Sequence, residues 1–206
     1  LEILGDTYHA LYLYVQARPM HGEALRLRRA LFGSNHVSVA NSLERLSLAL
    51  TDRSGFDIVE SERLLREAMT IRQSLSSAET ADTVRCLNAL ALLRSLQDDS
   101  AGAEALYKDA LQMGKRVLKA ESPEVADSLE GLGNLLVHRD DLTGAEANFR
   151  EALRIRRNLL GDLHPGVAKL ISAIGWVMES RGNMPEAEKL YLEGLAATKR
   201  VYGEVH

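Results

Sequence analysis

The fold is decided by residues 129–157, which read LEGLGNLLVHRDDLTGAEANFREALRIRR. The same arrangement recurs along the chain, because three equivalent segments open at Leu87, Leu129 and Ile171, a constant interval of about 42 residues. Further along each segment an alanine recurs at the same interval, at Ala103, Ala145 and Ala187. Internal similarity with a period of about 20 to 50 residues is the signature of a stacked repeat.

Two more segments extend the pattern toward the N-terminus. The second opens at Leu43 and is two residues longer, because we expect an expanded turn at 52–57, and the first opens in phase at Leu1. We therefore expect one array over 1–206, with units of roughly 1–35, 36–79, 80–121, 122–163 and 164–206. The chain starts in mid-repeat without methionine and stops at His206, the equivalent of His164. We expect it to be a fragment of a longer array.

Each unit is predicted to be a pair of helices. Leu129, Leu132 and Leu136 fall on one face of a helix with a period of 3.6, and no strand-like alternation is present. Turns are predicted at 54–55, 98–100, 140–141 and 182–183. Glycines that can end a helix in a left-handed conformation stand at Gly33, Gly161 and Gly203, and prolines suited to a first helical turn at Pro123 and Pro165. The predicted fold class is all-α, with ten helices in five antiparallel pairs.

Small residues at two repeat positions would let the helices approach closely. One position holds Gly5, Ser47, Ala91, Gly133 and Gly175, and the other holds Ala24, Ala68, Ala110, Ala152 and Gly194. We expect Phe149 and Tyr191 to fill the space beside them.

This pattern of leucine, glycine or alanine, and a later aromatic resembles the tetratricopeptide repeat. Because the period is longer than the ordinary repeat of that family and the linker at 160–165 reads LGDLHP, the chain is similar to the kinesin-light-chain-like subgroup. The resemblance implies a right-handed superhelical solenoid of five antiparallel helix pairs. It also implies a scaffold for protein–protein interactions.

The first segment departs from the pattern. Tyr12 to Val15 occupy the expected turn, and Pro19 falls where the second helix should already be running. Proline inside a helix costs about 3 kcal/mol. We therefore expect the first helix to continue to near Ala17 and the second to start at Pro19; a normal turn followed by a frayed helix start is the alternative.

Composition excludes several classes of function. No apolar run is long enough to span a membrane, and 25 Lys and Arg stand against 29 Asp and Glu, so we expect neither membrane nor nucleic-acid binding. The single cysteine, Cys86, is predicted to be a packed thiol, and it agrees with a cytoplasmic location.

Motifs for catalysis, metals and cofactors are absent from the sequence. It contains no glycine-rich phosphate loop, no Cys-x2-Cys pair and no His-Glu-x2-His. His36, His164 and His206 share one repeat position and are interpreted as residues at the start of helices. The basic runs at 26–29 and 154–157 are predicted to form a solvated face of second helices, with a basic ridge as the alternative. We expect no enzyme activity, no cofactor and no metal.

The resemblance implies that the first helix of each pair lines a concave groove. Carried onto this sequence, the partner-binding positions are Asn41, Glu44, Leu48, Arg85, Asn88, Leu92, Asp127, Glu130, Asn134, Lys169, Ser172 and Trp176. The first segment offers Glu2 and Asp6, and Ser95, His138 and Glu179 lie a turn further on. Of the paired asparagines that the family uses to hold a peptide, only Asn88 is retained at its position, so a strong carboxylate clamp is not expected.

Trp176 is the only tryptophan. It is either an aromatic anchor for a ligand or a residue that packs against a neighbouring helix. Two functions remain open at this point: a scaffold that binds an extended peptide or a helix of a partner protein in the groove, and a structural or regulatory array that contacts other domains or self-associates.

Overall fold

The computed structural model describes residues 1–10, 14–50, 57–75, 79–118 and 120–202. Within these ranges the chain forms ten α-helices and no β-strand, as the helical period predicts. In chain order they are α1 (Glu2–Ala10), α2 (Tyr14–Phe32), α3 (Val37–Leu50), α4 (Ile58–Ser74), α5 (Ala81–Leu96), α6 (Ser100–Val117), α7 (Pro123–His138), α8 (Leu142–Leu160), α9 (Pro165–Ser180) and α10 (Met184–Tyr202).

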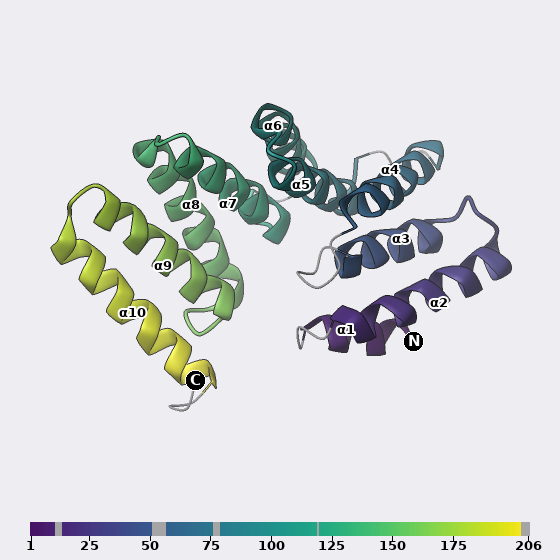
Figure 1. Ribbon diagram of the computed structural model, residues 1–206, viewed down its shortest axis with the longest axis horizontal. Coiled ribbons are helices and arrows are strands. Elements are labelled where there is room, and N and C mark those ends of the chain that lie inside the picture. Colours follow the sequence, from purple (N-terminus) through teal and green to yellow (C-terminus); the bar gives the residue numbers. More distant parts are fainter. Residues whose placement is uncertain (11–13, 51–56, 76–78, 119, 203–206) are drawn as a thin grey trace. The chain divides into compact units, whose positions relative to one another are not determined.

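The chain divides into two compact units, Leu1–Leu93 and Arg94–His206. In the first unit α2 packs on α1 and α3, and α3 also packs on α4. In the second unit α7 packs on α6 and α8, and α9 packs on α8 and α10. Figure 1 shows α9 and α10 side by side, running in opposite directions. The predicted fold class, an all-α arrangement of antiparallel helix pairs, is therefore confirmed within each unit.

Glycines on first helices make room for rings on second helices, as the small-residue pattern predicts. A Cβ atom at Gly133 would lie 2.5 Å from Cε1 of Phe149, and one at Gly175 would lie 2.9 Å from Cε1 of Tyr191. Such distances are well inside van der Waals contact, so a side chain could not be added without moving the ring. The ring of Phe149 lies in the core of the second unit, where it is fully buried.

The turns that follow α5, α7 and α9 repeat the same backbone geometry. Asp98, Asp140 and Gly182, which occupy one position in successive repeats, all have positive φ angles, of 61°, 61° and 78°. The next residue then caps the following helix: the carboxylates of Asp99 and Asp141 accept hydrogen bonds of 2.9 Å from Gly102 N and Gly144 N. These predicted turns are confirmed, whereas 54–55 lies outside the described residues.

The predicted helix ends are also confirmed where the structure describes them. Gly33 and Gly161 follow α2 and α8 with φ angles of 77° and 75°, and Pro123 and Pro165 are the first residues of α7 and α9. Gly203 and the expanded turn at 52–56 lie outside the described residues.

The first segment corrects our expectation for Pro19. The first helix ends at Ala10, and the second already begins at Tyr14, so that Pro19 lies inside α2. Residues 11–13 lie outside the described ranges. The residues around the proline explain the difference: Ala17 is completely buried, and His21 places its ring 2.6 Å from where a Cβ of Gly5 would be. Packing of α2 on α1 thus offsets the hydrogen bond that proline cannot donate.

Candidate interaction site

All twelve predicted partner-binding residues lie on the first helices of their pairs, at equivalent positions. Those of the first unit, here called the α3–α5 face, are Asn41, Glu44, Leu48, Arg85, Asn88 and Leu92. Those of the second unit, here called the α7–α9 face, are Asp127, Glu130, Asn134, Lys169, Ser172 and Trp176.

Burial separates these residues into two kinds. Glu44, Asn88 and Glu130 are buried, so most of their surface is not available to a ligand. The other nine are half-buried or exposed. Of the further positions, Asp6 forms an ion pair with Arg45, and Glu179 accepts a hydrogen bond of 2.7 Å from the Tyr191 hydroxyl.

A buried ionic cluster lies beneath the α3–α5 face. Arg72 of α4 is 1% exposed and donates from Nη2 to Glu44 Oε2 at 2.8 Å and to Asn41 Oδ1 at 2.9 Å. On the other side of Glu44, Arg85 donates from Nε to Oε1 at 3.0 Å. Glu44 therefore binds an arginine from each neighbouring helix and holds Arg85 in place.

Two titratable groups of this cluster have shifted pKa values. Burial, reinforced by the Glu44 carboxylate, raises the pKa of the Cys86 thiol to about 12. The Sγ atom of Cys86 lies 2.7 Å from Nη1 of Arg72. Although partial burial lowers it, the charges of Glu44 and Asp82 raise the pKa of Arg85 above its usual value. The predicted packed thiol is confirmed, since Cys86 is completely buried.

The second unit repeats this arrangement beneath the α7–α9 face. Arg156 of α8 places Nη2 2.7 Å from Asp127 Oδ1 and 2.6 Å from Glu130 Oε2. Lys169 of α9 reaches back to Glu130, with Nζ 2.7 Å from Oε1. Glu130 thus joins α7 to α9 as Glu44 joins α3 to α5, and the two positive charges balance the two negative charges.

Sequence reasoning missed the arginines that hold these clusters. Arg156 belongs to a basic run for which we expect a solvated face, and that prediction is wrong for this residue, because only 14% of its side chain is exposed. It is also wrong for Arg28, which donates to Ser42 Oγ at 2.7 Å, whereas Arg26 and Arg154 are exposed as expected. The sequence does contain a signal for these clusters. Arg72 and Arg156 occupy equivalent positions in the second and fourth repeats, and the same two repeats carry Glu44 and Glu130 at an equivalent position of their first helices.

Lys169, Ser172 and Trp176 share one face of α9. They are spaced i, i+3 and i+7, so their side chains leave the helix in similar directions. Trp176 is 46% exposed, which is unusual for so large an apolar side chain. Asn134 of α7 is exposed as well. The α7–α9 face therefore offers an aromatic ring, an ammonium group and an amide.

Other kinds of site are not seen in the described part of the chain. No three His, Cys, Asp or Glu side chains come together there as metal ligands would. None of the helices described combines the length and the apolarity needed to cross a lipid bilayer.

The repeat pattern is matched by known protein families. One family model described as tetratricopeptide repeat matches residues 124–200, and a second with the same description matches 1–38 and 83–124. No curated protein matches the chain in sequence.

Three solved structures illustrate the likeness in fold. BtubC (BKLC) from P. vanneervenii is 21% identical with a TM-score of 0.75, and the match covers 98% of this chain and 79% of that one. A putative kinesin light chain of Podosopora anserina with nearly identical TPR-like repeats is 16% identical with a TM-score of 0.66, covering 98% and 94%. The Rap conjugation gene regulator of the plasmid pLS20, solved with a Phr peptide, is 16% identical with a TM-score of 0.82, covering 97% and 52%.

Family models and helix-pair geometry agree over most of the chain. The matched ranges contain the glycines that face aromatic rings, Gly133 and Gly175, and the recurring turns at Asp98, Asp140 and Gly182. The chain belongs to the tetratricopeptide repeat family.

Proposed function

We propose that this chain is a non-catalytic interaction module that binds a segment of a partner protein on the faces of its first helices. Its ligand is an extended peptide or a helix that lies across the α7–α9 face or across the α3–α5 face. The scaffold positions are the same in each repeat, whereas the exposed side chains differ, which is the arrangement expected of a surface selected for recognition.

The observation that carries this proposal is the exposed Trp176 on the same face of α9 as Lys169. A tryptophan that is 46% exposed on a first helix has a large apolar surface to bury, and tryptophans often contribute about 2 kcal/mol or more at an interface. Because Glu130 fixes the Lys169 ammonium group at 2.7 Å, the two groups are presented with a defined spacing.

Charge balance supports a particular kind of ligand. Arg85 and Lys169 are both compensated by neighbouring carboxylates, so neither face has an excess of positive charge to bind an acidic segment strongly. The choice of peptide ligand then depends on apolar contact and on hydrogen bonds to the peptide backbone. The Rap regulator, similar in fold, was solved with a peptide bound, which is consistent with this use of the fold.

Panning of a phage-displayed library of random peptides on the purified chain tests the proposal. Selected peptides are expected to change the emission of Trp176, the only tryptophan, and to lose about thirtyfold in affinity in Trp176→Ala. Lys169→Glu should also weaken them. Lys189→Glu is the matched control, because both lysine side chains are 72% exposed and the charge change is the same.

Two results would count against the proposal. Selected peptides that bind Lys169→Glu, Trp176→Ala and the wild type equally would place the binding surface elsewhere. Self-association without any peptide binding would favour a structural array instead.

A further inference from the structure

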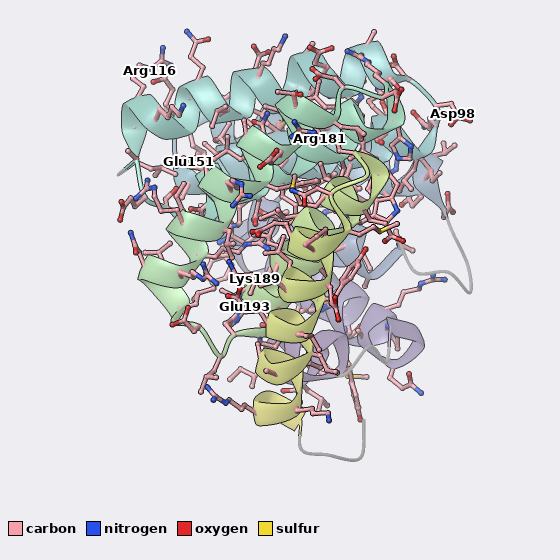
Figure 2. The ribbon with its side chains drawn as sticks, turned by 90° about the vertical axis from the view of Figure 1, so that its left-hand side faces the viewer. Asp98, Arg116, Glu151, Arg181, Lys189 and Glu193 are labelled. Atoms are coloured by element: carbon pink, nitrogen blue, oxygen red, sulfur yellow. The ribbon has the colours of Figure 1, made fainter. Side chains whose placement is uncertain are left out.

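The outer face of α10 exposes apolar side chains at positions that α8 keeps covered. Phe149 and Leu153 of α8 are 1% and 6% exposed and lie in the core cluster to which α9 contributes. The equivalent residues of α10, Tyr191 and Leu195, are 37% and 49% exposed. They line a pocket of about 430 Å³ on this face. Figure 2 is drawn with α10 nearest the viewer.

Ion pairs between successive helices show what kind of helix packs on such a face. Glu104 of α6 pairs with Arg139, which follows α7, and Glu146 of α8 pairs with Arg181, which follows α9. Figure 2 shows Arg181 where α9 ends. Both pairs have the same register, since each covering helix ends with an arginine that reaches a glutamate on the helix beneath it. The third glutamate of the series, Glu188 of α10, lies in the wall of the pocket and has no ion-pair partner among the described residues.

Helix α10 also differs from the other second helices at one position. In α4, α6 and α8 this glutamate pairs with a basic residue four positions later, in Glu62–Arg66, Glu104–Lys108 and Glu146–Arg150. In α10 that position holds Leu192, which is 60% exposed. Leu192 therefore leaves Glu188 without an ion-pair partner in its own helix. It also makes the apolar surface of α10 wider than that of α8, where Arg150 stands at this position.

We propose that the α10 face, defined by Glu188, Tyr191, Leu192 and Leu195, binds an amphipathic α-helix of a partner protein. The aliphatic stripe of that helix covers Tyr191, Leu192 and Leu195, and an arginine at its C-terminal end pairs with Glu188. A second copy of this chain does not fit as the occupant. In the first repeat, the sequence position equivalent to Arg181 holds Leu11, which carries no charge to pair with Glu188.

The probe for this site is a synthetic peptide of residues 164–183, which contains α9 and Arg181, held helical by a lactam bridge on its exposed side and labelled for fluorescence anisotropy. Saturable binding to the 206-residue chain is expected. Leu195→Asp should weaken binding roughly thirtyfold, because covering Leu195 as fully as Leu153 buries about 80 Å² of apolar surface. Because Leu195 is exposed, the variant should still fold, and circular dichroism checks this.

A charge exchange tests the register independently. Glu188→Arg is expected to weaken the probe about fivefold, and a probe that carries Arg181→Glu should regain that loss with this variant only. Glu186→Arg, on the same helix but outside the pocket, is the control and should leave the affinity unchanged.

Three outcomes would overturn the proposal: absence of saturable binding, binding that neither Leu195→Asp nor Glu188→Arg changes, and failure of the charge exchange to restore affinity. Sedimentation that shows self-association abolished by Leu195→Asp would also overturn it, because the occupant would then be a second copy. Peptides that bind the α7–α9 face are expected to bind Leu195→Asp as they bind the wild type. A failure of the α10 proposal can therefore be told apart from a failure of the proposed function.

Discussion

Replacement of Arg72 by methionine should destabilise the first unit far more than removal of an arginine normally does. The guanidinium group is 1% exposed and hydrogen-bonds Glu44, Asn41 and Cys86, at 2.8, 2.9 and 2.7 Å. Methionine keeps most of the aliphatic volume but leaves the buried carboxylate of Glu44 with one partner fewer. Breaking a buried ion pair costs about 3 to 5 kcal/mol. Because Arg85 still binds Glu44 at 3.0 Å, we expect a loss of about 3 kcal/mol.

Equilibrium unfolding in urea, followed by far-UV circular dichroism, measures this loss. The m-value of each variant shows whether the same surface unfolds, which makes the free energies comparable. Arg154→Met is the control, because Arg154 is exposed and its surface ion pairs with Glu151 and Glu121 should contribute little to stability. The double variant Arg72→Met with Glu44→Gln should recover part of the loss, since no carboxylate then remains buried at that site.

The reasoning is refuted if Arg72→Met and Arg154→Met lower the free energy of unfolding by the same amount. It is also refuted if Glu44→Gln adds a further full loss to Arg72→Met, because the two effects would then be independent.

Three other predictions concern packing and protonation. Gly133→Ala should cost about 1 to 2 kcal/mol in urea unfolding, because its Cβ would lie 2.5 Å from a carbon of the buried Phe149 ring, whereas Gly175→Ala, which faces an exposed ring, should be nearly neutral. Ala152→Leu should cost about 1 to 3 kcal/mol by overpacking a fully buried position, and an unchanged midpoint would contradict this assignment. Burial raises the pKa of Cys86 from 9.0 to about 12, so its contribution to stability is complete below pH 9 and is lost as the pH rises. Between pH 8 and 10 the wild type should lose about 1 kcal/mol more than Cys86→Ala, and equal slopes for the two would contradict the shift.

Much of the fold could be predicted because it depends on local, repeated signals. The glycine and the ring at Gly133 and Phe149 return together one repeat later at Gly175 and Tyr191, so their contact could be expected without coordinates. The turns at Asp98 and Asp140 follow from the same repetition.

The electrostatics of the candidate site could be predicted less well. An arginine on a second helix can bend its long side chain toward solvent or toward the first helix, and the sequence pattern does not distinguish these. Arg154 is exposed and Arg156 is not, although they are close neighbours in one basic run. Likewise, Glu44 and Glu130 lie at positions that the family resemblance assigns to a ligand, yet both are buried by arginines from neighbouring helices.

The sequence by itself determined the repeat, its length, the helix pairs and the helices that carry the variable residues, because each of these depends on residues close together in the chain. Only the tertiary structure decided which variable residues are available to a partner. Arg72 and Glu44, like Lys169 and Glu130, belong to different helices and lie far apart in the sequence, so their pairing depends on how whole helices pack. Packing also kept Pro19 inside α2 and left the α10 face exposed, since burial at one helix is set by what lies against it.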